Sequence, residues 1–304
     1  MKKDFVSLKE CTASRIEAIF KKADTLQRSK VKSLAGKSLA LIFEKPSMRT
    51  RVSFEVGMFQ LGGATIHLGP EDIQLGVRET VEDAAQVLSR YVDGIAARTF
   101  SHQDVENLAK HASVPVINGL SDLEHPCQAL ADLYTIRKIH RGLKGVKIAY
   151  IGDCNNVLHS LLQGSSLVGA HVSVATPHGY EPISSILREA EACGKKSGSR
   201  ITLCHDPEEA VRNADIVYTD VWTSMGQEKE KEKRVKEFEG FQVNESLMKL
   251  ARPSARFMHC LPAHRGEEVS AEVLEGKQSV VLDQAENRLH VQKAILVMLL
   301  GKKK

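Results

Sequence analysis

The fold of this chain is decided by the stretch Phe43-Glu44-Lys45-Pro46-Ser47-Met48-Arg49-Thr50-Arg51-Val52-Ser53-Phe54. The apolar run at 39–43, which leads into it, has the length of a buried strand. After it, apolar residues recur at helical spacing until Gly62-Gly63, a pair that ends helices. The residues 47–51 therefore lie where a strand passes into a helix, which is the repeating unit of an α/β fold.

The start of that helix has the chemistry of a phosphate-binding site. A first helical turn offers unpaired backbone N–H groups and the positive end of the helix dipole. Ser47 and Thr50 add hydroxyl groups, and Arg49 and Arg51 add guanidinium groups that bind phosphate through paired hydrogen bonds. The alternative interpretation is a solvated basic turn that only caps a helix.

Composition bounds the class of protein. A chain of 304 residues with 42% hydrophobic residues suits two domains with ordinary cores. The net charge of +4 has no dominant basic block behind it, so nothing indicates nucleic acid binding. No secretory signal or membrane-spanning run is visible, so we expect a cytoplasmic protein without a membrane partner. The six cysteines have no metal-like spacing, which predicts free thiols and no metal site; they are Cys11, Cys127, Cys154, Cys193, Cys204 and Cys260.

Strands and helices alternate along the whole chain, which predicts parallel sheets with helical crossovers. We expect two domains, each with a parallel sheet flanked by helices, joined by a long linking helix at 126–140 with Pro126 in its first turn. The predicted strands are 39–43, 64–68, 94–98, 114–118, 147–151, 171–175, 200–204, 215–219, 256–260 and 279–283. The other predicted helices are 50–61, 80–91, 103–112, 156–168, 182–193, 207–213, 244–251 and a last one from about 286.

Two local patterns give further expectations. Ser14-Arg15-Ile16-Glu17 has the form of a capping box that opens the first helix. The segment 228–239 carries five basic and five acidic residues, which predicts a solvated flexible loop.

Polar motifs of the first half lie at strand ends and helix starts. His125 and Gln128, in the segment His125-Pro126-Cys127-Gln128, are three residues apart, so both can point from one helical turn toward one place. Arg98 ends a predicted strand, and parallel sheets bind ligands at such ends. Each of these could also be an ordinary cap, core or surface residue.

The second half has three such motifs. Gly152-Asp153-Cys154-Asn155-Asn156 follows a predicted strand but lacks the glycine fingerprint of dinucleotide-binding folds. The others are Asp220-Val221-Trp222-Thr223-Ser224-Met225-Gly226 and His259-Cys260-Leu261-Pro262. Turn chemistry alone accounts for Asp, Ser and Gly at a strand end, and Cys260 could be a small buried apolar residue.

Together these motifs resemble the aspartate/ornithine carbamoyltransferase family over most of the chain. The resemblance implies transfer of the carbamoyl group of carbamoyl phosphate to the side-chain amine of L-ornithine, with L-citrulline and phosphate as products of a step in arginine biosynthesis. It implies no metal or organic cofactor. The family commonly has Thr where this chain has Met48. The backbone N–H of Met48 remains available as the phosphate donor.

The resemblance also implies roles for individual residues. Catalytic roles fall to Arg98, His125, Gln128 and Cys260. Ornithine would be bound by Asn156, Asp220, Ser224, Met225, Cys260 and Leu261. Carbamoyl phosphate would be bound by Ser47, Met48, Arg49, Thr50, Gln74, Arg98, His125, Pro126, Cys127, Gln128, Cys260, Leu261 and Arg288. Gln74 would come from a neighbouring subunit, which implies a homotrimer or a higher assembly of trimers.

The implied domains are 1–130, which binds carbamoyl phosphate, and 131–285, which binds ornithine. The last helix, 286–304, would pack back on the first domain, with Arg288 opening it. Two alternatives stay open: a transcarbamoylase for aspartate or a diamine such as putrescine, and a non-catalytic or dinucleotide-binding α/β protein. Asp220 followed by Ser-Met-Gly favours an amino acid that carries two amines, because an aspartate enzyme would need cations there.

Overall fold

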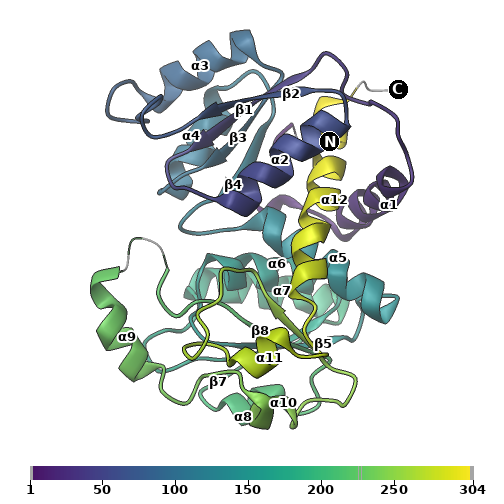
Figure 1. The fold of residues 1–304 in the computed structure, drawn as a ribbon, viewed down its shortest axis with the longest axis vertical. Helices are drawn as coiled ribbons and strands as arrows, with labels where there is room; N and C mark the ends of the chain where they lie inside the picture. Colours follow the sequence, from purple (N-terminus) through teal and green to yellow (C-terminus); the bar gives the residue numbers. More distant parts are fainter. Residues whose placement is uncertain (1–2, 225, 227, 302–304) are drawn as a thin grey trace. The chain divides into compact units, whose positions relative to one another are not determined.

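The computed structural model describes residues 3–224, 226 and 228–301, and the chain forms two compact units. One unit contains residues 1–131 together with 286–304, and the other contains residues 132–285. Each unit is built on one parallel sheet, so the predicted α/β class with two parallel sheets flanked by helices is confirmed. Figure 1 labels most of the elements along the chain.

The sheet of the first unit has the strand order β2-β1-β3-β4. All three pairings are parallel, and Phe43 at the end of one strand lies opposite Arg98 at the end of its neighbour. The carboxyl ends of the strands therefore share one edge, where the phosphate motif begins. The strands are β1 (Ser38–Phe43), β2 (Ala64–Leu68), β3 (Gly94–Arg98) and β4 (Val116–Leu120).

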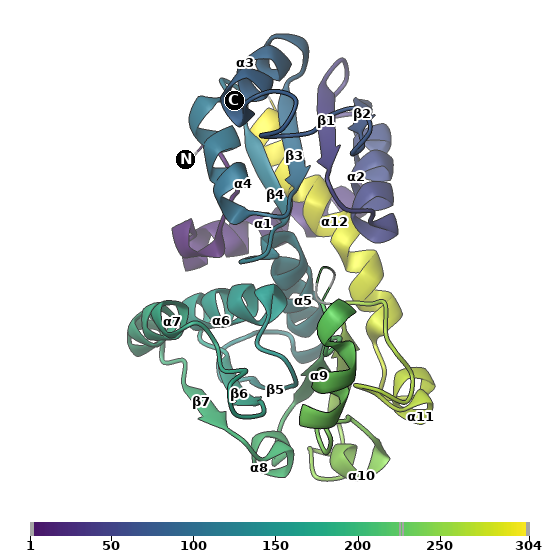
Figure 2. The ribbon, with the colours of Figure 1, turned by 90° about the vertical axis from the view of Figure 1, so that its left-hand side faces the viewer.

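Helices cover both faces of this sheet (Figure 2). On one face, the apolar sides of α3 and α4 pack against alternate residues of β1 and β3 such as Ile42 and Ile95. On the other face, Gly57 of α2 lies against α12, where an added Cβ would approach the Lys293 side chain to 3.3 Å. The helices are η1 (Leu8–Glu10), α1 (Ala13–Gln27), α2 (Met48–Gln60), α3 (Val81–Tyr91) and α4 (His102–His111).

The sheet of the second unit has the order β7-β6-β5-β8-β9 and is also wholly parallel. Its central strand, β5, is buried from Ile148 to Ile151. Helices α6 and α7 lie side by side on one face (Figure 2), and α8, α10 and α11 pack on the other. The strands are β5 (Lys147–Ile151), β6 (His171–Ala175), β7 (Ile201–Cys204), β8 (Ile216–Thr219) and β9 (Arg256–His259). The helices are α6 (Asn156–Val168), α7 (Ser184–Ser197), α8 (Pro207–Val211), η2 (Glu228–Glu230), α9 (Lys231–Glu237), α10 (Glu245–Met248) and α11 (Ala271–Glu275).

Both boundaries between the units fall inside helices. One lies in α5 (Pro126–His140) and the other in α12 (Val281–Leu300). The later part of α12 packs on the first unit, where Leu300 lies beside Gly94 of β3. This confirms the prediction that the last helix returns to the first domain. None of the described helices is long and apolar enough to cross a membrane.

The predicted start of the first helix is wrong by two residues. Thr12, not Ser14, is its N-cap, and the Thr12 hydroxyl accepts a hydrogen bond from the Arg15 backbone N–H over 3.1 Å. Ser14 lies inside the helix and its hydroxyl bonds to that of Thr12. Two hydroxyl residues compete for the cap here, and the capping box pattern selects the wrong one.

The predicted strand 279–283 is also wrong. Ser279 makes a single bridge to Phe257, and the helix α12 begins at Val281. Val281 and Gln284 are buried at helical spacing, so tertiary burial overrides the strand propensity of the two valines. Arg288 consequently lies in the third turn of α12 and does not open the helix. The predicted strand 114–118 lies two residues further along, as Val116–Leu120.

The segment 228–239 is helical over most of its length and does not form the predicted flexible loop. Arg234 of α9 is buried and donates hydrogen bonds to the Glu230 carboxylate and to the Trp222 carbonyl. Charges four residues apart stabilise one side of the helix, and a distant partner fixes Arg234. The segment with alternating charges is therefore a helix, and Arg234 anchors it to Asp153.

Candidate active site

The start of α2 has the features expected of an anion-binding site. Ser47 caps the helix with extended backbone angles, and its hydroxyl accepts a hydrogen bond from the Thr50 N–H over 3.3 Å. Met48 is the first helical residue and is 70% exposed. Arg51 forms an ion pair with Glu55 at 2.9 Å and lies on the exposed side of the helix. Of the two predicted guanidinium groups, Arg49 is therefore the candidate for the anion.

Backbone and side-chain bonds hold this helix start beside the end of β3. The Glu44 N–H donates to the Arg98 carbonyl over 2.9 Å. The Glu44 carboxylate accepts from the Phe100 N–H over 2.6 Å, and the Lys45 ammonium lies 4.2 Å from the Phe100 ring centroid. The loops after β1 and β3 thus form one connected surface at the carboxyl edge of the sheet.

The buried imidazole of His125 is under the electrostatic influence of three arginines. Burial is the main cause that lowers the pKa of His125 well below its ordinary value, and the positive charges of Arg288, Arg98 and Arg49 add to it. The imidazole is therefore neutral at physiological pH and can donate or accept a hydrogen bond. The three charges come from α12, β3 and α2, and they act on a histidine that directly precedes α5.

Arg288 completes this cluster through Thr50. Its Nη2 atom donates to the Thr50 hydroxyl oxygen over 2.6 Å, and both residues are buried. The bond connects α12 to the first turn of α2. A charged donor thereby lies against the predicted phosphate-binding turn.

The start of α5 supplies the remaining groups of the first unit. Gln128 is buried, and its backbone N–H donates to the His125 carbonyl over 3.1 Å. The Cys127 thiol donates to the Asn118 carbonyl over 3.4 Å, and burial raises its pKa to about 12. Cys127 is therefore a structural thiol and not a nucleophile. Pro126 is the first helical residue.

Gln74 lies in the exposed loop between β2 and α3. Its carbonyl accepts from the N–H groups of Val77 and Arg78, both over 3.0 Å. A hollow of about 460 Å³ is lined by residues 76–82 together with Asn107 and His111. No predicted site residue lines it, so this hollow is separate from the arginine cluster around His125.

In the second unit, three strand ends meet at the carboxylate of Asp220. Asn155 donates from Nδ2 to Oδ2 of Asp220 over 2.7 Å, and the Cys260 thiol donates to Oδ1 over 2.9 Å. These residues follow β5, β8 and β9, which are neighbours in the sheet. The carboxylate is buried, and the two hydrogen bonds fix its orientation. A fixed carboxylate of this kind suits the recognition of an ammonium group.

Asn155 is a site residue that the sequence did not single out. Its side chain caps α6 by accepting from the Val157 N–H over 2.9 Å, while its amide binds Asp220. The predicted residue, Asn156, is the first residue of α6 and is half-buried. Asn155 therefore caps the helix and orients Asp220, whereas Asn156 is the next residue, at the start of the helix.

A buried histidine holds the loop that contains Cys260. The His259 Nδ1 atom accepts from the Leu261 N–H over 2.8 Å, and its Nε2 atom lies 3.2 Å from the Glu268 carboxylate. Leu261 has a φ of 61°, a left-handed backbone that costs energy in a non-glycine residue. Sequence reasoning missed His259 and Glu268 as supports because their pairing is visible only in three dimensions.

Asp153 and Arg234 anchor the segment that leads to Ser224. The two side chains form an ion pair at 3.3 Å. Burial raises the pKa of Asp153 to about 6, although the Arg234 charge opposes the shift. Arg234 also binds the carbonyl of Trp222, two residues before the half-buried Ser224. Met225 lies outside the described residues.

One metal-like grouping occurs among these residues. Ligand atoms of Asp220, His259 and Cys260 lie within 4.8 Å of one another. Both ring nitrogens of His259 already have hydrogen-bond partners, so this histidine serves the backbone and Glu268 and not a metal.

The chain matches two family models that together span most of its length. Residues 3–138 match the carbamoyl-P binding domain of aspartate/ornithine carbamoyltransferases, and residues 144–299 match the Asp/Orn binding domain. Ornithine carbamoyltransferase of Thermococcus kodakarensis is 54% identical, and the match covers 98% of this chain and 96% of the relative. Ornithine carbamoyltransferase of Bacillus subtilis is 54% identical over 301 residues, which cover 99% of this chain and 94% of the relative.

Solved structures agree with the sequence comparison. Ornithine carbamoyltransferase from Pyrococcus furiosus superposes with a TM-score of 0.96 at 54% identity and covers 99% of this chain and 98% of that one. Anabolic ornithine carbamoyltransferase from Campylobacter jejuni gives a TM-score of 0.95 at 41% identity and covers 98% of this chain and 99% of that one. The chain belongs to the aspartate/ornithine carbamoyltransferase family.

Proposed function

We propose that this protein transfers the carbamoyl group of carbamoyl phosphate to the side-chain amine of L-ornithine and releases L-citrulline and phosphate. The observation that carries the choice of acceptor is the carboxylate of Asp220, fixed by Asn155 and Cys260. Such a carboxylate attracts the α-ammonium group of an amino acid and repels a second carboxylate. Relatives at 54% identity are named ornithine carbamoyltransferases, which supports the same acceptor.

In this proposal the first unit binds carbamoyl phosphate. The phosphate lies on the α2 start, with Ser47, Met48, Arg49 and Thr50 as its partners. The carbonyl oxygen is polarised by Thr50, Arg98, His125, Gln128 and Arg288. The positive charges of Arg288, Arg98 and Arg49, which act on His125, support this assignment. A dianionic phosphate and a developing oxyanion are both stabilised by fixed positive charge.

The second unit binds ornithine in this proposal. Asp220 pairs with the α-ammonium group, Asn156, Ser224 and Met225 hold the amino-acid end, and Cys260 with the Leu261 carbonyl contacts the side-chain amine. The proposed domains are 1–130 with 286–304 for carbamoyl phosphate and 131–285 for ornithine. The compact units 1–131 with 286–304 and 132–285 support that division.

The amine nitrogen then forms a bond to the carbonyl carbon, and the bond from that carbon to the phosphate oxygen breaks. Nucleophile and leaving group both belong to substrates, so no covalent enzyme intermediate forms. The amine reacts in its neutral form. If its pKa is about 10.4, as for a lysine, deprotonation at pH 7 costs about 4–5 kcal/mol. Turnover should therefore rise from neutral to alkaline pH.

A comparison of acceptors tests the proposal. The protein is incubated with carbamoyl phosphate and, separately, with L-ornithine, putrescine or L-aspartate, and the carbamoylated product is quantified. We expect kcat/KM for ornithine to exceed the other two by at least about 100-fold, since each loses an ammonium or carboxylate contact. Equal or better turnover of putrescine or aspartate would overturn the choice of ornithine as the acceptor.

We further propose a homotrimer in which Gln74 serves the site of a neighbouring subunit. Gln74 lies in an exposed loop, and a cyclic ring would present such a loop to the next chain.

We also propose a cytoplasmic location, since the six free cysteines are typical of a reducing compartment.

A further inference from the structure

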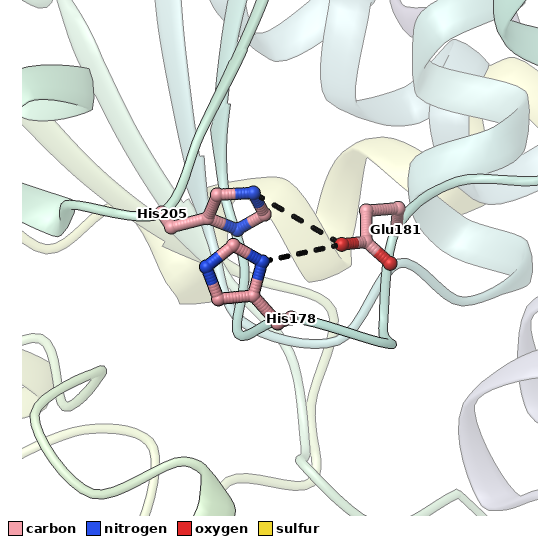
Figure 3. Close-up of side chains that lie close together, drawn as sticks. All are labelled: His178, Glu181 and His205. Carbon is pink, nitrogen blue, oxygen red and sulfur yellow. Dashed lines mark ion pairs between the residues drawn. The ribbon is translucent and has the colours of Figure 1, made fainter.

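A second group of chemically active side chains lies at the same edge of the sheet as Asp220, but two strands away. His178 and Glu181 lie in the loop that follows β6, and His205 directly follows β7. The two strands are neighbours in the sheet, with Ala175 opposite Cys204 at their carboxyl ends. The parallel fold thus brings the three side chains together from two loops (Figure 3).

The ligand atoms of this group point toward a shared centre. Glu181 Oε1 lies 3.9 Å from His178 Nδ1 and 4.0 Å from His205 Nε2 (Figure 3). The two imidazole rings lie with centroids 3.7 Å apart and planes at 34°. Ligand atoms around a tetrahedral zinc ion lie about 3.3 Å apart, given bonds of about 2.0 Å. A small rotation of these exposed side chains closes the difference.

Neighbouring atoms orient two of the three ligands. The His205 Nδ1 atom lies 2.8 Å from the Thr176 carbonyl oxygen, so it donates its proton there and leaves the Nε2 lone pair directed at Glu181. The Gly179 N–H donates to Glu181 Oε2 over 2.9 Å, which leaves Oε1 directed at the histidines. A carbonyl behind the histidine and a donor behind the carboxylate are the usual supports of metal ligands.

We propose that His178, Glu181 and His205 bind a divalent transition-metal ion of the zinc class. Two imidazole nitrogens and one carboxylate oxygen suit Zn²⁺ or Co²⁺, whereas Mg²⁺ and Ca²⁺ prefer oxygen-only sites. The His178 side chain is 83% exposed, so the remaining coordination positions are open to water or to a ligand from solution. The site contains none of the residues assigned above to carbamoyl phosphate or ornithine.

The third metal-like grouping of the described residues is less suited. His264, Glu267 and Glu268 also lie within reach of one another. Glu268 is already bonded through Oε1 to the buried His259 and to the His264 backbone N–H. A metal would have to break those contacts, whereas His178, Glu181 and His205 keep theirs.

Within the same unit, the proposed metal site is connected to α9 through Tyr180. This residue lies between two of the proposed ligands in the sequence, and its ring lies 4.9 Å from the Arg234 guanidinium carbon. Its hydroxyl donates to the Glu237 carboxylate of α9. Arg234 in turn binds Asp153. A bound metal would therefore fix the loop that supports α9.

Co²⁺ binding to the full chain tests the proposal directly. After dialysis against a chelator, the protein is titrated with Co²⁺ while the visible spectrum is recorded. We expect one Co²⁺ per chain with d–d bands of a nitrogen and oxygen site and without thiolate charge transfer. His178→Ala and His205→Ala should each weaken this binding at least ~10-fold, since loss of even a supporting residue costs that much. His264→Ala should leave it unchanged.

The fold of each variant is checked by its metal-free thermal transition, which should match that of the parent protein. If either alanine variant fails this check, Glu181→Gln replaces it, because the amide keeps the bond from the Gly179 N–H and loses the charged ligand. Binding that is unchanged in the folded variants would overturn the proposal. So would a thiolate charge-transfer band as the only Co²⁺ signal, because it would place the metal on a cysteine.

Discussion

Arg288 donates a hydrogen bond from Nη2 to Oγ1 of Thr50 over 2.6 Å, although 238 residues separate them in the sequence. The bond brings a guanidinium group from α12 to the first turn of α2, beside the Ser47 cap. The same charge also lowers the pKa of His125. The C-terminal helix therefore contributes to the proposed carbamoyl phosphate site as well as to the packing of the first unit.

Arg288→Gln should raise KM for carbamoyl phosphate and lower kcat/KM by about 10- to 150-fold, the value of a charged hydrogen bond of about 1.5–3 kcal/mol. The pKa of His125, followed by NMR, should rise because one neighbouring cation is lost. Lys293→Met is the matched control, since Lys293 lies on the same helix and binds Gln60 over 2.9 Å. Unchanged carbamoyl phosphate kinetics in Arg288→Gln would remove this arginine from the site.

Asp153 should give the folded state a distinct pH dependence. Its pKa is about 6 in the folded protein, against an ordinary value of 3.8 for an aspartate, so the folded state holds its proton more tightly than the unfolded chain does. The unfolding free energy should therefore fall as pH rises from about 4 to 6, by up to about 3 kcal/mol. In Asp153→Asn this part of the slope should disappear. Denaturant titrations of both proteins at several pH values measure it, and parallel curves would contradict the assignment.

Sequence patterns predicted most of the fold because buried apolar residues follow one another along each strand and recur at helical spacing along each helix. The strands β2, β3, β5 and β6 and the helix α5 have the predicted bounds. The two errors of element type arose where a distant partner decides the outcome. The charged segment 228–239 is a helix because Arg234 reaches Asp153, and 279–283 begins a helix because Gln284 is buried against His259 and Asp132.

The candidate site was predictable to a similar extent. Family motifs select Asp220 and Cys260, and the structure places the two in contact. Asn155 was missed because the sequence does not show which residue of an Asn-Asn pair caps the helix. The support of Cys260 by His259 was missed because its partner, Glu268, approaches only in the folded chain.

Cys260→Ser should lower ornithine turnover about 10-fold without abolishing it. The thiol donates to Asp220 Oδ1 over 2.9 Å, and a hydroxyl can make the same bond with altered length and acidity. Steady-state kinetics with ornithine measure the effect, and Cys193→Ser is the control because Cys193 lies on α7. Mass spectrometry that detects a carbamoylated Cys260 during turnover would show instead that the thiol is a nucleophile.

Mixed subunits test whether Gln74 is shared. Arg49→Ala and Gln74→Ala are each expected to be severely impaired. If they are refolded together in equal amounts, about three quarters of random trimers are mixed and each mixed ring has one intact site. Activity should then recover to about a quarter of the wild-type value. Mixing Arg49→Ala with Arg98→Ala is the control, because both residues serve the same site and no recovery is expected.

Mass measurement must show that mixed trimers formed. If they did and the mixture stays as inactive as its parents, Gln74 does not serve a neighbouring site. Recovery in the Arg98 control would show that Arg49 and Arg98 act in different sites, which would contradict the cluster around His125.

The proposed activity is the transfer of a carbamoyl group from carbamoyl phosphate to ornithine. Carbamoyl phosphate labelled with ¹³C at its carbonyl carbon, supplied with L-ornithine as acceptor, allows this transfer to be followed atom by atom. We expect labelled citrulline and phosphate in equal amounts, at a rate that falls sharply in Arg49→Ala while the thermal transition of that variant stays intact. Phosphate released without labelled citrulline, or labelled citrulline formed equally well by Arg49→Ala, would contradict the proposal.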